Sequence, residues 1–387
     1  MSSEGPASSQ QANGDFDESR VSTLELFFDL VFVFAFTQVT GYLAHHLTWA
    51  GMLQGAALLA ALWWAWVSYS WLTNAVSALE AIQARIVILS AMAAMLIASL
   101  AVPDTFGDDG VLFGLSYFVV RLLQVALYAI ATSDEPRTRQ AILRLAPGFL
   151  GGPALLVVAG FLDGLPQGVL WAAALAIDYG VPLLRGVVGF HIRAAHFVER
   201  HGLVIILALG ESIAVIGAAG VDLSARVVLA AVFAIALSAG LWWAYFDYVV
   251  LAAERRLSAA QGHERARLAR DPYSYMHLPM VAGIIFVALG LEETLAHVGD
   301  PLGMKTALAL CGGVALYLLG HNAFRLRDVG SVSVPRLAVA VLCCAFIPVA
   351  LMVPSLFSVA VLAALLAALA AFETVRPHEF RREVRTR

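Results

Sequence analysis

Three ionisable residues interrupt long apolar stretches of this chain: Arg121, Asp178 and Glu211. An ionisable group at the centre of a bilayer costs roughly 2.5–3.5 kcal/mol on insertion scales, so each such group needs an explanation. One interpretation is an ion or proton pathway in which the carboxylates act as carriers. The other is a buried ion pair between Arg121 and one carboxylate, which would hold helices in register. Because two carboxylates compete for one arginine, one of them is left unpaired, which favours the pathway slightly.

Glu25 and Asp29 lie four residues apart, so they share one face of a helix. Residues 22–25 (Ser-Thr-Leu-Glu) have the spacing of a capping box, in which Glu25 reaches back to the start of the helix. Capping does not explain Asp29, which lies one turn deeper. We expect a cytoplasmic ion pair between Asp29 and Arg20 or Arg85.

Two histidines also lie within apolar stretches. His277 comes just before Pro279, where a proline could loosen a helix. A lone histidine near a membrane interface is usually structural, and a role in the pathway is the alternative. With the polar residues of two similar segments described below, the candidates for an ion or solute pathway are Glu25, Asp29, Gln38, Arg121, Asp178, Glu199, Glu211, Ser212, His277 and His321.

The sequence shows no sign of enzyme chemistry. It contains no His-x-x-x-His, Gly-x-Ser-x-Gly or His-Glu-x-x-His string. Cys311, Cys343 and Cys344 lack the spacing of a metal site and are expected to be small core residues. We therefore predict no catalytic residue, no metal and no cofactor.

Twelve apolar segments must position these residues. Hydrophobic residues make up 60% of the chain and charged residues 13%, against about 25% charged in soluble domains. A helix that crosses the hydrocarbon core needs roughly 20 apolar residues, and helices satisfy their own backbone groups there. We predict an all-α polytopic membrane protein with about 12 transmembrane helices. The approximate spans are 24–46, 50–72, 83–102, 110–131, 140–161, 168–186, 202–220, 225–250, 273–295, 303–325, 335–353 and 355–373.

The arginines predict how the chain is oriented. Most fall in the loops that follow even-numbered spans, whereas the other loops are short and acidic or neutral, as in residues 103–109. By the positive-inside rule both termini are cytoplasmic. We expect a disordered N-terminal tail over residues 1–22 and a basic C-terminal tail over 374–387. The net charge of −4 gives no reason to expect a nucleic-acid partner.

Two further segments have amphipathic character. Residues 254–270 predict a cytoplasmic amphipathic helix that lies on anionic lipid. The aromatic stretch from Trp63 to Trp71 is typical of an interface belt, and a wall on which a substrate stacks is the alternative.

The chain also shows signs of an internal repeat. Trp63-Trp64-Ala65 matches Trp242-Trp243-Ala244, and residues 117–121 match 317–321. The first and seventh segments each begin near a glutamate and carry polar residues about twelve positions later. These pairs keep their order, so we predict two parallel six-helix halves, 23–186 and 187–373. Parallel repeats of this kind are a known plan of transporters.

Two strings resemble one family. Residues 25–38 (ELFFDLVFVFAFTQ) closely resemble the first-helix signature of the bacterial low temperature requirement A (LtrA) family, and residues 199–213 resemble its second signature. Residues 317–325 are similar to a late segment of the family. The resemblance implies a multi-pass protein of the bacterial cytoplasmic membrane, linked by name to growth in the cold, with no settled biochemical activity. The matched polar positions are Glu25, Asp29, Gln38, Glu199, Glu211 and Ser212.

A secondary transporter or ion-conducting protein is the preferred function. It rests on the repeat and on the ionisable residues at mid-span. A membrane sensor or scaffold for cold adaptation is one alternative, although the chain offers no soluble domain beyond its tails. A membrane-embedded enzyme acting on a lipid-linked substrate is the other. We expect the bilayer, anionic lipid and an unknown small solute or ion as partners, and the sequence specifies no oligomeric state.

Overall fold

The computed structural model describes residues 21–75, 82–132, 136–187, 190, 192–218, 224–247 and 249–375. Most of the two predicted tails lies outside these ranges. Nearly all of the described residues are helical, and these ranges contain no β-strand element. The predicted all-α class is therefore confirmed.

Twelve helices of at least 17 residues fill the described ranges, in agreement with the predicted number. They are α2 (Thr23–His45), α3 (Trp49–Ala75), α4 (Ile82–Leu100), α5 (Gly110–Ala131), α6 (Pro136–Ala159), α7 (Gly164–Arg185), α8 (Ala194–Ala218), α9 (Ala225–Phe246), α12 (His277–Ala296), α13 (Met304–Val329), α14 (Val334–Ala350) and α15 (Ser355–Val375). A short 3₁₀ turn, η1 (Val102–Asp104), precedes α5. Ten helical segments are long and apolar enough to cross a membrane, and α14 is a shorter apolar helix.

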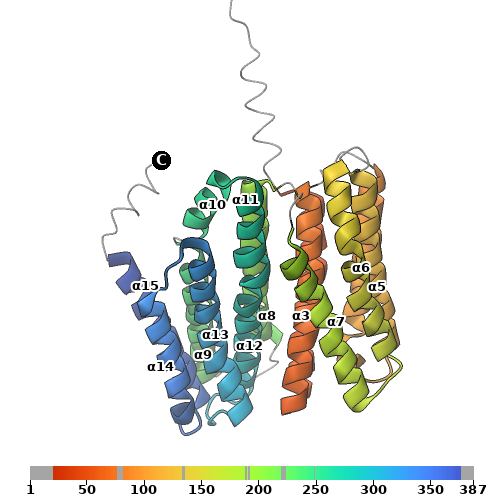
Figure 1. The fold of residues 1–387 in the computed structure, drawn as a ribbon. Coiled ribbons are helices and arrows are strands. Elements are labelled where there is room, and N and C mark those ends of the chain that lie inside the picture. The colour runs from red at the N-terminus through yellow and green to blue at the C-terminus, as the bar shows by residue number, and fades with distance from the viewer. Residues whose placement is uncertain are drawn as a thin grey trace, which may run out of the picture.

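The outer surface of the bundle is apolar. On α2, for example, Leu26, Phe27 and Leu30 are 42%, 54% and 56% exposed. Apolar side chains exposed over this many helices mark a surface that faces lipid rather than water. The helices run up and down through the bundle, and both described ends of the chain lie at its upper end (Figure 1).

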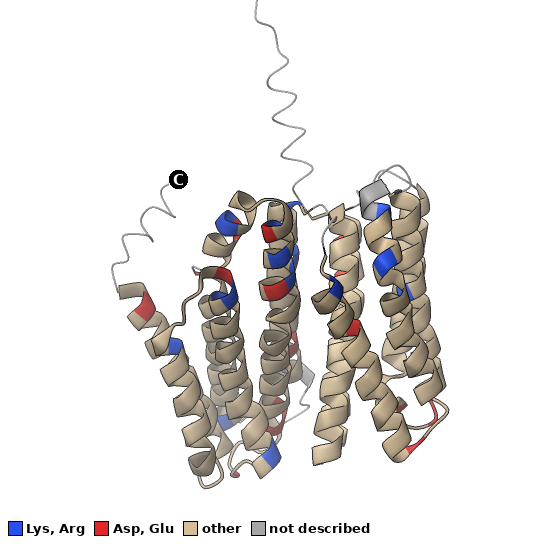
Figure 2. Cartoon of the chain, in the orientation of Figure 1, with Lys and Arg blue, Asp and Glu red and all other residues tan. Residues whose placement is uncertain are grey.

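Charged residues gather at the two ends of the bundle (Figure 2). Arginines dominate the upper end, where the chain begins and ends, and acidic residues are prominent in a loop at the lower end. This distribution follows the arginine pattern of the sequence. That the upper end is cytoplasmic stays a prediction.

The segment between α9 and α12 differs from the predicted surface helix. It forms α10 (Val249–Ala259), α11 (Gly262–Leu268) and a π-helix, η2 (Ala269–Tyr275), which leads into α12. Leu257 and Leu268 are 1% and 2% exposed, so the apolar side packs on protein. The predicted binding of anionic lipid by this segment is untested.

The same order of packing occurs in the two halves. In the first half, α2 packs on α3 and α4, α4 on α5, α5 on α6, α6 on α7, and α3 on α5 and α7. In the second half, α8 packs on α9 and α12, α12 on α13, α13 on α14, α14 on α15, and α9 on α13 and α15. The hydroxyl of Tyr117 donates to the Ala61 carbonyl at 3.0 Å, and that of Tyr317 donates to the Leu241 carbonyl at 2.7 Å. A shared order is what the predicted duplication requires.

The aromatic residues of α3 lie in the core of the bundle rather than at a membrane interface. Trp63 and Trp66 are fully buried, and Trp71 is 9% exposed. The interpretation of residues 63–71 as an interface belt is therefore wrong, because α3 is packed against α2, α5, α7, α8 and α12. The backbones of α12 and α13 also approach each other closely. A Cβ on Gly283 would lie 2.6 Å from the Gly313 carbonyl oxygen, so neither position has room for a side chain.

Candidate functional site

Four charged or titratable side chains form a buried cluster between α2 and α8, near the upper end of the bundle. The Nε2 atom of His196 lies 3.0 Å from Glu25 Oε1, and Nη2 of Arg200 lies 2.9 Å from Asp29 Oδ1. Nη1 of Arg200 also lies 3.6 Å from Glu25 Oε1. All four residues are at most 3% exposed. We call this group the upper site.

Hydrogen bonds from Ser22 and Trp66 hold the two carboxylates of the upper site in place. Ser22 and Glu25 form the predicted capping box, in which the Ser22 backbone N–H donates to Glu25 Oε2 at 2.8 Å. This part of the sequence prediction is confirmed, yet Glu25 also takes part in the ion-pair cluster. Asp29 accepts a hydrogen bond from the indole of Trp66 at 2.9 Å.

The residues predicted from the sequence did not include His196 and Arg200, the two basic members of the upper site. Asp29 pairs with Arg200, whereas Arg20, one of the predicted partners, lies outside the described residues. A signal was present, because His196 and Arg200 lie four residues apart, as Glu25 and Asp29 do. Two helices that each carry a pair at this spacing can join them face to face.

Glu199 lies outside the upper site although it neighbours Arg200 in sequence. Its side chain is exposed and accepts a hydrogen bond from the Val21 backbone N–H at 3.1 Å. It therefore serves to hold the start of the described chain rather than to line a buried path.

A second polar group lies lower on the same two helices. Glu211 is 2% exposed, and the Thr37 hydroxyl donates to its Oε2 atom at 2.7 Å. Within the described ranges Glu211 forms no ion pair, and it does not pair with Arg121. Ser212 is buried beside it with an unpartnered hydroxyl, and Gln38 is half-buried on α2. We call Glu211 and Thr37 the lower site.

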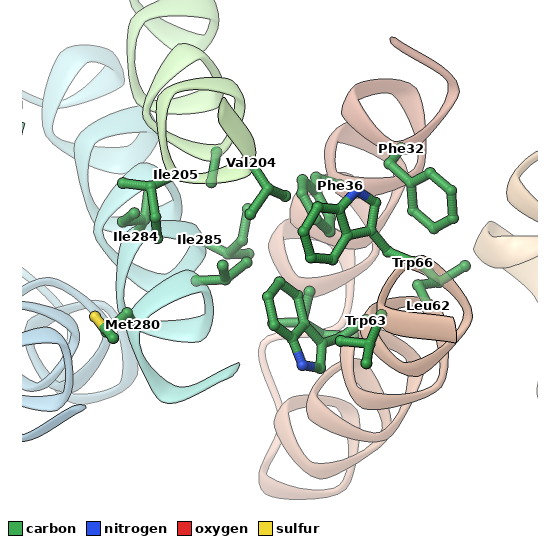
Figure 3. Close-up of a cluster of buried hydrophobic side chains, with 14 of the residues drawn as sticks. Phe32, Phe36, Leu62, Trp63, Trp66, Val204, Ile205, Met280, Ile284 and Ile285 are labelled. Carbon is green, nitrogen blue, oxygen red and sulfur yellow. The ribbon is translucent and has the colours of Figure 1, made fainter. Parts of the chain in front are cut away.

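Apolar side chains lie between the upper and lower sites along α2 and α8, and Figure 3 shows them packed together. We call this group the apolar layer, and its members are Phe32, Phe36, Leu62, Trp63, Trp66, Val204, Ile205, Met280, Ile284 and Ile285. Every one of these side chains is at most 1% exposed. The layer comes from α2, α3, α8 and α12, which all pack on one another.

Arg121 and Asp178 form a separate ion pair between α5 and α7. Nη2 of Arg121 lies 3.6 Å from Asp178 Oδ1, and Nη1 donates to the Ser68 hydroxyl. The Tyr117 hydroxyl lies 3.2 Å from Asp178 Oδ2. Of the two interpretations drawn from the sequence, the buried ion pair fits Arg121, because it joins three helices of the first half.

The two candidate histidines are buried in the second half, at the start of α12 and in α13. The rings of His201 and His277 lie 5.0 Å apart between centroids, and the Tyr245 hydroxyl lies 2.8 Å from His277 Nε2. Nη1 of Arg336 donates to His321 Nδ1 at 3.1 Å. In the part of the chain that the structure describes, no three His, Cys, Asp or Glu side chains are placed to share a metal ion.

Comparison with known proteins identifies the family to which the chain belongs. A sequence profile described as "Bacterial low temperature requirement A protein (LtrA)" matches residues 20–371. The chain belongs to the LtrA family. It is also similar to an uncharacterized protein, RA0937, of Rhizobium meliloti (strain 1021), with 29% identity over 319 residues, which cover 79% of this chain and 76% of that protein.

The polar positions that carried the resemblance to LtrA fall mainly on one interface. Glu25 and Asp29 belong to the upper site, and Glu211 belongs to the lower site with Ser212 beside it. Residues of the LtrA strings thus contribute to two polar sites on α2 and α8, a buried upper one and a lower one in which Glu211 is buried and Thr37 is exposed. Their carboxylates can take up or release a proton or bind a cation.

Proposed function

We propose that this LtrA family protein is a secondary transporter or ion-conducting protein whose ion path runs along the interface of α2, α8 and α12. The observation that carries the proposal is Glu211. It is a buried carboxylate whose hydrogen bond comes from a threonine hydroxyl, with no ion pair among the described residues.

The position of Glu211 suits an ion-binding group. It lies 17 residues after the start of α8 and 7 residues before its end, or about 25 Å and 10 Å along the axis at 1.5 Å per residue. A buried carboxylate without a cation is too costly to remain charged and alone. It must therefore bind a proton or a cation, and exchange of that ion is the basic step of a coupled transporter.

Three helices of the same direction repeat one pattern along the proposed path. On α2 the polar residue Asp29 is followed by Phe32 and Phe36 and then by Thr37. On α8, Arg200 is followed by residues 204–205 and then by Glu211, and on α12, His277 is followed by residues 284–285 and then by Glu292. Each helix thus contributes to an upper polar group, a middle apolar layer and a lower polar group.

The apolar layer supports alternating access. In the conformation described, its side chains are all buried and lie between the two polar sites along α2 and α8. A path that is open to both ends at once would leak ions, so a transporter needs such a closed layer between its sites. Movement of α2 or α8 against α12 would open it to one end at a time.

The proposed duplication places this path where the two halves meet. If α2 and α8 are equivalent first helices, they contact each other across the axis that relates the halves. Transporters with internal repeats bind substrate and coupling ion at that interface. We also propose that both termini are cytoplasmic and that the protein lies in the cytoplasmic membrane, because the arginine-rich upper end is then inside.

The test is flux into proteoliposomes that contain the purified full-length protein. Uptake of monovalent cations and the decay of an imposed pH gradient are measured for the native protein and for Glu211→Gln. We expect flux above that of empty liposomes, and its loss in Glu211→Gln.

Glu199→Gln provides the control, because it neutralises an exposed carboxylate on the same helix. Its flux should equal that of the native protein. Native flux in Glu211→Gln would remove Glu211 from the path. Growth of a deletion strain in the cold, restored by the native gene and not by Glu211→Gln, would connect the activity to the family name.

A further inference from the structure

A cavity of ≈ 40 Å³ lies away from the proposed ion path, among α3, α5, α6, the end of α7 and η2. Five of its thirteen lining residues are aromatic: Trp64, Trp71, Tyr128, Phe149 and Phe190. We call it the aromatic cavity. An adjoining cavity of ≈ 30 Å³ shares Val187 and Arg270 with it and continues to Arg267 and His263 of α11. The aromatic cavity therefore lies beside a second cavity whose lining includes Arg267 and Arg270.

Three side chains that line the aromatic cavity carry a buried polar atom with no hydrogen-bond partner in the described structure. These atoms are the indole N–H of Trp64, the amide oxygen of Gln124 and the hydroxyl of Tyr128. The three residues are 3%, 1% and 1% exposed. The great majority of buried polar groups in native proteins are paired. Three unpaired groups around one cavity therefore point to a bound molecule that pairs them.

The charges near the cavity are already compensated. Arg270, at the wall, lies 2.6 Å from Asp271 Oδ1 and donates to the Pro182 carbonyl at 3.1 Å. Arg121 lies behind Ser68 and pairs with Asp178. A charged ligand would find no free opposite charge among the lining residues, so the site fits an uncharged one.

The three unpaired atoms also specify the groups of the ligand. The Gln124 amide nitrogen donates to the Ser68 carbonyl at 3.3 Å, which leaves the amide oxygen as an acceptor. Trp64 can only donate, and the Tyr128 hydroxyl can do either. A matching ligand donates one hydrogen bond to Gln124 and accepts hydrogen bonds from both Trp64 and Tyr128, as a single carbonyl or hydroxyl oxygen can.

We propose that this cavity binds a small uncharged solute that carries both a hydrogen-bond donor and an acceptor, such as a primary amide or an alcohol. A water needs about 10–15 Å³ on the same measure, so ≈ 40 Å³ holds a solute of a few heavy atoms. The site does not depend on the proposed ion path, because its binding can be measured without flux.

Equilibrium dialysis of radiolabelled acetamide against the purified full-length protein tests the proposal. Acetamide offers N–H donors and one carbonyl acceptor. We expect saturable binding to the native protein. Tyr128→Phe and Gln124→Leu should each weaken it by about tenfold, the effect of losing one hydrogen bond to a buried group. N,N-dimethylacetamide, which has no N–H, should compete much less well than unlabelled acetamide.

Tyr69→Phe is the matched control. Tyr69 is fully buried on α3, but its hydroxyl donates to the Val120 carbonyl at 2.9 Å and does not line the cavity. This variant should bind acetamide normally and melt at a lower temperature. Tyr128→Phe should melt no lower than the native protein, because its hydroxyl has no protein partner to lose.

Three results would overturn the proposal. The first is that the native protein shows no saturable binding of acetamide, as expected if water alone occupies the cavity. The second is unchanged affinity for acetamide in both cavity variants. The third is a clearly lower melting temperature of Tyr128→Phe.

Discussion

Asp178 and Glu211 are a natural pair for comparison, because both are carboxylates, both lie well inside a long helix, and both are 2% exposed. They differ in their partners. Asp178 faces Arg121 and Tyr117, whereas Glu211 accepts from Thr37 and forms no ion pair within the described ranges. Burial alone therefore does not separate a structural carboxylate from a candidate ion carrier. The partner does.

The largest effect is expected where the partner is a buried arginine. Asp178→Asn would leave the Arg121 guanidinium buried without a counter-charge, and breaking such a pair costs about 3–5 kcal/mol. We expect a much lower melting temperature in detergent and poor expression. The measurement is thermal unfolding of the purified variant beside the native protein.

Replacing both members sharpens this prediction. Arg121→Met combined with Asp178→Leu removes the charges together, and such replacements are often neutral. The double variant should be more stable than Asp178→Asn alone. If it is less stable, the stabilisation by these residues does not come from their charges.

A smaller effect is expected at the upper site. Asp29→Asn removes the closest acceptor of Arg200, but Glu25 remains 3.6 Å from the guanidinium. A hydrogen bond to a charged group is worth about 1.5–3 kcal/mol, so the loss of stability should be about half of that in Asp178→Asn. Unfolding of the two variants under the same conditions checks the order. Equal losses would mean that Glu25 gives Arg200 no support.

Glu211→Gln should have a still smaller effect on stability. No ion pair is broken, and the glutamine oxygen can still accept from Thr37, so the change in unfolding free energy should stay within about 1 kcal/mol. Thermal unfolding alone makes this test, separately from any flux. A loss as large as that of Asp178→Asn would contradict the distinction drawn between the two carboxylates.

Glu199→Gln should have the smallest effect on stability. Its side chain is exposed, and its one described contact is with the backbone of Val21 at the start of the described chain. Such substitutions seldom change stability measurably. A marked drop in melting temperature would show that this contact anchors α2 against α8.

The helices could be predicted from the sequence because lipid demands apolar runs of a set length. All twelve predicted spans fall on long helices of the structure. The capping box at residues 22–25 was predictable for a similar reason, since it depends on residues three apart. Local and compositional rules are sufficient for such features.

Features that depend on which helices meet could not be predicted. The partner of Asp29 is Arg200, 171 residues away. The matching four-residue spacing on the two helices does not by itself indicate that these helices meet. The tryptophans of α3 were assigned to an interface because aromatic residues gather there, but α3 is enclosed by five other helices. The π-helix before α12 was missed as well, because the arginines of residues 254–270 gave that segment the character of a surface helix.

The contact of Gly283 with Gly313 has a mechanical consequence. The backbones of α12 and α13 meet there with no space for a side chain, so sliding one helix along the other would drive the next turn into the facing backbone. Because α12 carries residues of the apolar layer, any displacement of α12 that changes access to Glu211 must take α13 with it. His321 and its contact with Arg336 would then shift in the same step. The moving part is a rigid helix pair, and its displacement would also move residues on the side of the bundle away from the ion path.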